Sequence, residues 1–279
     1  MVDMDSIVAP SDLFDPADRF RPDGVALVTG AGGGIGRATA FDFAAAGVDV
    51  ALTDRRTDAL QAVESAIETS FEVGVHMVAG DLTDINDVDR VVEETVDELG
   101  GLDVLVNVAG GGAKHSTPKI APSDWDFVQD NNLKAPHLTA KAAYSHLRGG
   151  GAVVNLSSTV ATYGSPWMSH YAAAKAGVRS LTRSLATEWA GDDIRVNAVS
   201  PGPILTLSAS RNFELETDED LVARVRDRSV VDRDIGDVSE VADAILFLAS
   251  PAASHLTGLT IPVAGVPPSI EDVSVAKRA

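Results

Sequence analysis

The sequence predicts an α/β fold, with one doubly wound domain whose mostly parallel, seven-stranded sheet carries helices on both faces. Short apolar runs rich in β-branched residues alternate with amphipathic helical patterns along nearly the whole chain. Glycine-rich and polar motifs follow these runs, and ligands bind at the carboxyl ends of strands in such sheets. Because no Pro/Gly/Ser-rich linker divides the 279 residues, we expect one domain over 24–266, an acidic lead-in over 1–23 and a tail over 267–279.

The composition limits the possible functions. The chain holds 22 basic and 41 acidic residues, a net charge of −19, which argues against nucleic acid or acidic macromolecules as partners. Scarce lysine and abundant aspartate hint at high-salt surroundings, but we favour an ordinary acidic cytosolic protein. There is no cysteine, which excludes disulfides and thiolate chemistry, and the six histidines show no metal-ligand spacing, so we expect no metal.

Targeting signals are not evident in the sequence. The first 23 residues lack a basic segment followed by an apolar core, and no apolar run reaches the ~18 residues that a membrane-spanning helix needs. We therefore expect a cytoplasmic protein that does not interact with a membrane.

The first strand, Val25–Thr29, leads into a glycine loop that opens a helix. Glycines at this position allow backbone N–H groups to approach a pyrophosphate, and the helix N-terminus favours its negative charge. The motif Thr29-Gly30-x-x-x-Gly34-x-Gly36 therefore predicts a dinucleotide site, although a flexible glycine turn is an alternative. Contacts are expected from Gly30, Gly32, Gly33, Gly34, Ile35 and Gly36.

The second strand, 48–53, ends at Asp54. A carboxylate about 20 residues beyond the glycine loop can accept hydrogen bonds from the adenosine ribose and repel a 2′-phosphate, which favours NAD over NADP. Arg55 and Arg56 weaken this prediction, because an arginine here can hold the 2′-phosphate. Alternatively, Asp54 caps a helix that begins near Thr57.

The alternation continues through a helix at 58–70, a strand at 75–79, a helix at 84–99 and a strand at 102–106. Asp81 and Leu82 follow the third strand, where Asp81 can contact the adenine or simply begin the next turn. The fourth strand runs into Asn107, Ala109 and Gly110, where exposed backbone would let a cofactor pass.

A helix predicted over 123–147 carries two asparagines, Asn131 and Asn132. Asparagine has poor helix propensity, so these are either solvated surface residues or part of a kinked helix whose freed carbonyl binds water. The next strand, 153–156, ends at Ser157 and Ser158.

Tyr171 and Lys175 lie four residues apart on a helix predicted to end near Trp189, so they share one face. An ammonium beside the phenol would lower the pKa of Tyr171 and let it exchange a proton with an alcohol or ketone. His170 could tune this tyrosine, but adjacent helical residues point in different directions.

The last part of the chain completes the alternation with a strand at 194–199, a helix at 238–249 and a strand at 259–263. The first of these strands breaks at Ser200-Pro201-Gly202-Pro203. Residues 204–237 are acidic and loosely patterned, with one helix near 218–228, which is typical of a lid over a substrate.

Read together over residues 24–265, these motifs resemble the short-chain dehydrogenase/reductase family and its Rossmann fold. The matching residues are Thr29-Gly30-x-x-x-Gly34-x-Gly36, Asp81, Asn107-x-Ala109-Gly110, Asn132, Ser158, Tyr171-x-x-x-Lys175 and Pro201-Gly202-x-x-x-Thr206. The family's second asparagine in the strand-end motif is Val108 here, and Ala264-Gly265-Val266 stands where Asp-Gly-Gly is common.

The resemblance implies a role for each matched residue. Tyr171 would be the general acid/base, Lys175 would lower its pKa and bind the nicotinamide ribose, and Ser158 would hydrogen-bond the reacting oxygen. Asn132 would hold a proton-relay water. Pro201, Gly202, Ile204 and Thr206 would lie by the cofactor, the last two beside its carboxamide.

The predicted activity is hydride transfer between NAD(H) and a secondary alcohol or ketone, with NADP as the less favoured cofactor. Apolar and aromatic side chains favour a hydrophobic or cyclic, steroid- or terpene-like substrate, with pocket candidates His115, Ser158, Tyr163, Trp167, Met168 and Leu205. Reduction of a 3-oxoacyl thioester and a non-catalytic NAD-binding module are the alternatives. The resemblance also implies a homotetramer or homodimer, built around the helices that carry Asn132 and Tyr171.

Overall fold

The computed structural model describes residues 20–22, 24–112, 114–204, 206 and 235–265, and its core is one seven-stranded sheet in the order β3-β2-β1-β4-β5-β6-β7. Every strand pairing in this sheet is parallel. The predicted doubly wound α/β fold is thereby confirmed, with an all-parallel rather than mostly parallel sheet. The strands are β1 (Val25–Thr29), β2 (Asp49–Asp54), β3 (Val75–Ala79), β4 (Val104–Asn107), β5 (Ala152–Leu156), β6 (Arg195–Pro201) and β7 (Thr260–Val263).

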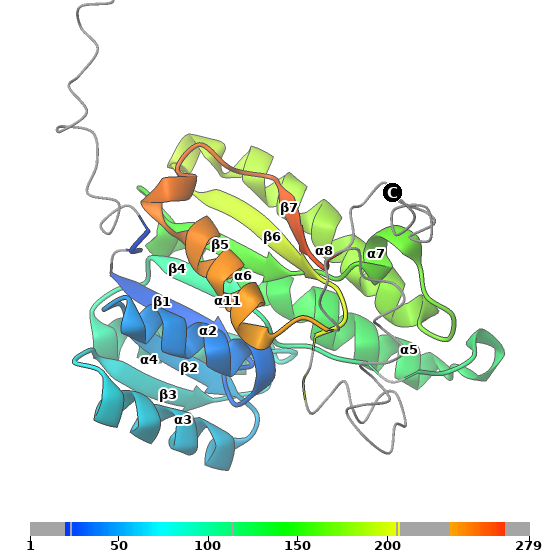
Figure 1. Cartoon of the computed structure of the whole chain (residues 1–279), viewed down its shortest axis with the longest axis horizontal. Coiled ribbons are helices and arrows are strands. Elements are labelled where there is room, and N and C mark those ends of the chain that lie inside the picture. The colour runs from blue at the N-terminus through cyan, green and yellow to red at the C-terminus, as the bar shows by residue number, and fades with distance from the viewer. Residues whose placement is uncertain (1–19, 23, 113, 205, 207–234, 266–279) are drawn as a thin grey trace, which may run out of the picture.

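Helices cover both faces of the sheet (Figure 1). One apolar core joins the sheet to α2 (Gly34–Ala45), α3 (Thr57–Ser70) and α11 (Val238–Ala249). A second joins the opposite face to α4 (Ile85–Leu99), α6 (Ala135–Leu147) and α8 (Ser169–Glu188). The shorter elements are α5 (Pro122–Gln129), α7 (Val160–Tyr163), η3 (Thr117–Lys119), η4 (Asp130–Lys134), η5 (Ala190–Asp192) and η6 (Pro251–Ala253).

The burial of the central strands explains why the sequence pattern predicted them. A parallel strand covered by helices on both faces is apolar without alternation, and all five residues of β1 are buried. Strand ends moved by one or two residues from the predicted positions. β4 begins two residues later than predicted, and β6 ends two residues later because Pro201 still pairs with Val263 in β7.

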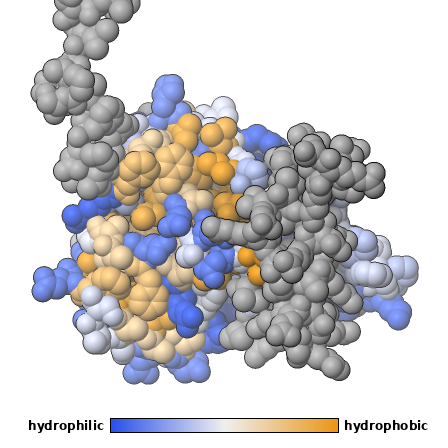
Figure 2. Space-filling view, in the orientation of Figure 1, coloured by the Kyte–Doolittle hydropathy of each residue, from blue (hydrophilic) through white to orange (hydrophobic). Residues whose placement is uncertain are grey.

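The predicted lid (204–237), its helix near 218–228 and the tail (267–279) lie largely or wholly outside the described residues, as does most of the lead-in. Phe20 is described, and its ring packs against Phe247 with the centroids 6.0 Å apart. Figure 2 shows apolar residues gathered on this face, which α2 and α11 cover.

Candidate active site

The glycine loop between β1 and α2 is built on contacts that exclude side chains. A Cβ at Gly36 would lie 2.2 Å from the carbonyl oxygen of Gly30, and one at Gly30 would lie 3.0 Å from the Cα of Ala109. Gly30 and Gly34 also have positive φ values of 68° and 53°. Thr29 fixes the loop against β4, since its Oγ1 accepts hydrogen bonds from the N–H groups of Val108 and Ala109.

This backbone cradle fits a dinucleotide. The loop ends in the first turn of α2, so its N–H groups and the helix dipole favour a pyrophosphate. Ile35 packs partly buried against the core, and Thr206 lies across from Gly34, its Cγ2 3.5 Å from where a Cβ would stand. The residues predicted to hold the cofactor therefore lie together at the carboxyl ends of β1 and β4.

Asp54, at the end of β2, lies beside the glycine loop. Its Oδ2 accepts a hydrogen bond from Gly32 N (3.3 Å), and its Oδ1 accepts one from Arg56 N (3.0 Å). The Arg56 guanidinium adds bonds of 3.1 Å from Nε to Oδ1 and 3.2 Å from Nη2 to Oδ2. Burial alone would raise the pKa of Asp54, but these bonds outweigh it and lower the pKa. Asp54 makes no capping bond to α3, whose N-cap is Arg56.

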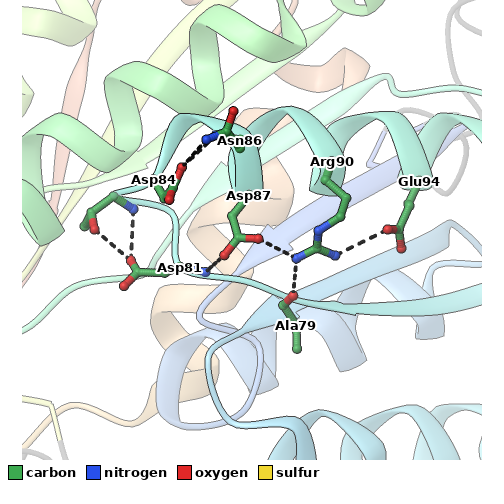
Figure 3. A network of polar contacts seen from close by, with 8 residues as sticks. Ala79, Asp81, Asp84, Asn86, Asp87, Arg90 and Glu94 are labelled. Carbon is green, nitrogen blue, oxygen red and sulfur yellow. Dashed lines mark hydrogen bonds and ion pairs between the residues drawn. The ribbon is translucent and has the colours of Figure 1, made fainter.

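Asp81, after β3, is part of a polar network at the start of α4 (Figure 3). Its Oδ1 accepts hydrogen bonds from the N–H and hydroxyl of Thr83, and its N–H donates to Asp87. Arg90 joins this network through Asp87 and the Ala79 carbonyl. The geometry favours the turn-forming alternative for Asp81, while the adjacent Leu82 is buried in the core. Contact of either residue with an adenine stays a prediction.

Asn107, at the end of β4, uses its side chain inside the fold. Its Nδ2 donates to Asn155 Oδ1 (3.0 Å) and its Oδ1 accepts from Thr139 Oγ1 (2.7 Å). Asn155 donates onward to Thr182. This buried polar chain ties β4 and β5 to α6 and α8, so the amide of Asn107 positions the strand ends, and any cofactor contact must come from the neighbouring backbone.

The predicted long helix is interrupted at Asn132. The interruption is η4, a π-helical turn between α5 and α6, and Asn132 within it is fully buried. Asn132 Nδ2 donates to Gly111 O (2.7 Å) and Val128 O (2.9 Å), and its Oδ1 accepts from Gly111 N (3.0 Å). Asn132 is therefore not a solvated surface residue, and the helix is interrupted there by a π turn, which often occurs at functional sites. A freed carbonyl that binds water stays a prediction.

Ser158, Tyr171 and Lys175 converge where β5 ends and α8 passes. The Tyr171 hydroxyl is hydrogen-bonded to Ser158, and Lys175 Nζ lies 5.7 Å from the centroid of the tyrosine ring. Lys175 is 2% exposed and donates to the Leu156 carbonyl at 2.7 Å. A Cβ at Gly110 would lie 2.5 Å from Asn132 Oδ1 and 3.5 Å from Lys175 Nζ, so the fourth predicted residue lies beside the other three.

The electrostatics of this pair differ from the prediction. Burial raises the pKa of Tyr171 to about 12, and the hydrogen bond from Ser158 offsets only part of that rise. Burial also lowers the pKa of Lys175 to about 8. We expected Lys175 to lower the pKa of Tyr171, but its ammonium is bound to Leu156 O, and the cost of burying a phenolate dominates.

The substrate candidates lie at the end of α7, at the start of α8 and in the segment before η3. Tyr163 and Trp167 are 47% and 59% exposed, and Trp167 has a positive φ of 64°. The last two of these regions are fastened together, since His115 N donates to Trp167 O and Thr117 bonds Ser169. Met168, at the N-cap of α8, is half-buried. Leu205 lies outside the described residues.

The end of β6 closes the site on its other side. Gly202 packs against β7, where a Cβ would lie 2.9 Å from the Cα of Ala264, and Gly202 N donates to Val263 O. Ile204 is 7% exposed and bridges to Gly236. Arg55 is exposed, and among the described residues its neighbour Arg56 is the one that bonds Asp54.

Two positioning residues were not identified from the sequence. Ser157 Oγ donates to the Lys175 carbonyl (3.0 Å), and Gln129 Nε2 donates to the His170 carbonyl (2.8 Å), so each holds the backbone of α8 next to a catalytic candidate. The serine pair at the end of β5 was a signal for the first, but nothing marked Gln129. His170 itself is buried, and burial and His115 lower its pKa.

Comparison with known proteins agrees with this geometry. The family model described as "Enoyl-(Acyl carrier protein) reductase" matches residues 30–265. The 3-oxoacyl-[acyl-carrier-protein] reductase FabG of Thermotoga maritima is 37% identical over 244 residues, covering 86% of this chain and 96% of that protein. The 2-(R)-hydroxypropyl-CoM dehydrogenase of Xanthobacter autotrophicus is 34% identical over 250 residues, covering 86% and 97%. A dehydrogenase/reductase structure from Sinorhizobium meliloti superposes with a TM-score of 0.82 at 30% identity, covering 89% and 97%.

Fold and site together define a Rossmann-fold oxidoreductase. The glycine cradle and the Ser158, Tyr171 and Lys175 cluster lie at one edge of the parallel sheet, as such chemistry requires. The chain belongs to the short-chain dehydrogenase/reductase family. No helix among the described residues is long and apolar enough to cross a membrane.

Proposed function

We propose that the protein interconverts a secondary alcohol and the corresponding ketone with NAD(H) as the preferred cofactor. The observation that carries this proposal is the hydrogen bond between Ser158 and Tyr171 beside a buried Lys175 and the glycine-lined cradle. Site roles, cofactor preference and substrate are the parts proposed, since membership of the family supports only the general chemistry.

Each residue has a separable task. A bound nicotinamide supplies or accepts the hydride. The Ser158 hydroxyl holds the reacting oxygen, and the Tyr171 hydroxyl gives that oxygen a proton or removes one. With a pKa near 12, Tyr171 is protonated at neutral pH and is ready to donate, which favours ketone reduction. Alcohol oxidation needs the phenolate, so its rate should rise with pH.

Lys175 and Asn132 organise the other side of the site. The buried ammonium of Lys175 donates to Leu156 O and would also bind the ribose hydroxyls of a nicotinamide. Asn132 pairs with both backbone groups of Gly111 and so fixes the segment that would contact the same ribose. A cofactor preference for NAD(H) is supported by Asp54 at the end of β2.

The substrate is proposed to be hydrophobic, and possible classes include cyclic, steroid- or terpene-like alcohols. Support comes from two exposed aromatic side chains that precede the Tyr171 helix: Tyr163 at the end of α7 and Trp167 in the loop that follows. A screen of secondary alcohols and ketones, followed by NAD(H) absorbance, is the direct measurement.

Replacing Tyr171 by Phe tests the mechanism. The variant keeps the ring but loses the hydroxyl, so turnover should fall by at least ~10²-fold, as expected for loss of a general acid. NADH binding, followed by fluorescence, should remain because the ring is retained. Tyr144→Phe, which removes a hydroxyl bonded to Asp192 at the far end of α6, is the matched control. Full activity in Tyr171→Phe would disprove the mechanism, whereas a wild-type protein that binds NADH but turns over no alcohol or ketone would favour a non-catalytic NAD-binding module.

Reduction of a 3-oxoacyl thioester is the second candidate, although the net charge of −19 and Asp54 count against it. One segment departs from that charge: residues 131–187 contain six Lys or Arg and no Asp or Glu, although Lys175 among them is buried. Turnover of acetoacetyl-CoA exceeding that of every simple ketone tested would establish this candidate over the first.

We also propose that the protein assembles as a homotetramer or homodimer and acts in the cytoplasm. Apolar surface on the α2 and α11 face, including the stacked Phe20 and Phe247 rings, supports self-association. Light scattering at micromolar concentration should give a multiple of the 29.0 kDa chain mass, and a monomer would contradict the proposal.

A further inference from the structure

The turn that carries Ser158 leads directly into α7. Ser158 O accepts a hydrogen bond from Ala161 N (3.0 Å), and Ser158 Oγ accepts a longer one from Val160 N (3.4 Å). A serine hydroxyl that bonds a backbone N–H two residues further on is oriented by that backbone. The direction of the Ser158 hydroxyl therefore depends on where α7 lies.

The short helix α7 needs support from elsewhere in the fold. It is four residues long, and a single helical turn is not stable by itself because its first hydrogen bonds do not offset the cost of fixing the backbone. Two contacts with α8 supply support: the bond between Tyr171 and Ser158, and a 2.7 Å hydrogen bond from Arg179 Nη1 to Thr162 Oγ1. Tyr171 and Arg179 are eight residues apart (179 − 171), about 12 Å along the helix axis, so α7 and the turn before it are held at both ends.

The surroundings of Arg179 indicate that the bond to Thr162 is its main polar contact. Its Nε is buried without a hydrogen-bond partner among the described residues. Residues 131–187 contain no Asp or Glu, so the neighbouring turns of α8 offer Arg179 no ion pair. Burying an unpaired N–H costs free energy, and a neutral side chain would avoid that cost. An arginine kept under these conditions is typical of a residue with a specific task.

We infer that Arg179 is a positioning residue for the proposed reaction: it holds Thr162, and thereby α7, so that the Ser158 hydroxyl points at the reacting oxygen. The inference deepens the proposed function and rests on it. Arg179 acts only through Thr162 and contacts neither the cofactor nor the substrate. Losing its guanidinium should therefore slow the chemical step and leave cofactor binding unchanged.

Steady-state kinetics of Arg179→Ala and Thr162→Val test this inference, with NADH and the ketone that the wild-type protein reduces fastest in the substrate screen. Each variant removes the same hydrogen bond, so kcat should fall by about 10-fold in both, because small misplacements of a catalytic group slow the reaction strongly. The double variant should be no slower than Arg179→Ala alone, since the effects of two residues in contact do not add. The NADH dissociation constant, measured by fluorescence, should change by less than ~2-fold.

Two conservative variants should restore the rate. Arg179→Lys keeps a cationic donor and Thr162→Ser keeps the hydroxyl, so kcat should stay within ~3-fold of wild type in each. Arg183→Ala is the matched control for charge, since it removes an exposed arginine one turn further along α8. Thr69→Val is the matched control for the hydroxyl, since Thr69 is exposed on α3 and its hydroxyl bonds the Ser65 carbonyl. Both controls should retain the wild-type kcat.

The outcomes separate the inference from the proposed function. A kcat within ~2-fold of wild type in either Arg179→Ala or Thr162→Val, a matching loss in Arg183→Ala, or an equal weakening of NADH binding overturns the inference while the proposed function stands. A kcat in Thr162→Ser as low as in Thr162→Val does the same. A wild-type protein that turns over no alcohol or ketone overturns both. Thermal melting shows whether each variant is folded. If Arg179→Ala does not fold, Thr162→Val decides, because it changes one exposed side chain.

Discussion

Two regions of this protein treat polar groups in opposite ways. Under β4 and β5, the Asn107, Thr139, Asn155 and Thr182 side chains form one hydrogen-bonded chain, and each is at most 3% exposed. Between α2 and α11, Asp42 has a buried Oδ2 without a hydrogen-bond partner among the described residues, and Asp243 adds a second negative charge nearby. The side chains of the first region are uncharged and hydrogen-bonded to one another, whereas the second region holds two carboxylates, one of which has an oxygen without a hydrogen-bond partner.

The difference shows which part of the fold is held rigidly and which part makes the stability of the fold depend on pH. Satisfied buried networks hold their elements in one arrangement, whereas an unpaired buried carboxylate destabilises the folded state whenever it is charged. The satisfied network lies beneath the strand ends that carry Ser158 and the Asn107 motif. Asp42 and Asp243 lie on the other face of the sheet, away from the catalytic candidates.

Breaking the satisfied network should have the largest effect. Asn107→Ala leaves Asn155 Oδ1 without its donor and opens a small cavity, so we expect a loss of about 2–4 kcal/mol in the free energy of unfolding. Urea denaturation measures it. Asn86→Ala at the start of α4 is the control (Figure 3). The exposed Asn86 side chain bonds only Asp84, and the Asn86 backbone N–H still donates to Asp84 in the variant, so the loss should be limited to about 0.5 kcal/mol.

Equal losses in the two asparagine variants would show that the buried chain does not anchor the sheet. A further readout is activity, which should fall in Asn107→Ala even where the protein remains folded, because the chain connects β4 and β5 to α8.

Removing the charge of Asp42 beside Asp243 should have an effect of intermediate size and opposite sign on the free energy of unfolding. Burial first, and then Asp243, raise the pKa of Asp42 from 3.8 to about 6. The folded state therefore binds more protons than the unfolded state between these values, so this stabilisation is complete below pH ~4 and lost as pH rises through ~6. Asp42→Asn should raise the free energy of unfolding at pH 7 by about 1–2 kcal/mol, since one pKa unit is about 1.4 kcal/mol and water reaches part of the side chain.

Urea denaturation at pH 7 and pH 4 measures this effect, which should be absent at the lower pH. Asp89→Asn is the control, since it removes the same charge from an exposed position on α4. A gain at pH 7 that persists unchanged at pH 4 would mean that the ionisation of Asp42 is not its source.

The sequence predicted the parts of this protein that depend on local pattern. The apolar β1 run, the glycine spacing from Gly30 to Gly36 and the four-residue step from Tyr171 to Lys175 each encode their own geometry, so the fold and the candidate cluster were predictable. Asn132 left two alternatives open, because helix propensity alone does not show whether a poorly placed asparagine is solvated or bonded to a distant loop.

The remaining features depend on tertiary surroundings. The direction of the Tyr171 pKa shift follows from burial, which no motif reports. The pairing of Arg56, rather than Arg55, with Asp54 depends on where α3 begins. The raised pKa of Asp42 could not be predicted from the sequence. Its neighbour Asp243 lies 201 residues away in the chain (243 − 42), and the two carboxylates come close only because α11 packs on α2.

Salt separates buried from exposed charge and gives the smallest predicted effect. A net charge of −19 makes the exposed acidic residues repel one another, and raising KCl from about 0.1 M to about 1 M shortens the Debye length from about 10 Å to about 3 Å. The small gain from Asp89→Asn, on the order of a few tenths of a kcal/mol, should therefore vanish in high salt. The gain from Asp42→Asn should largely persist, because desolvation is its main cause and ions do not screen it. Urea denaturation of both variants at the two salt concentrations measures this difference. If both gains disappeared at high salt, repulsion between charges rather than burial would explain why charged Asp42 destabilises the fold.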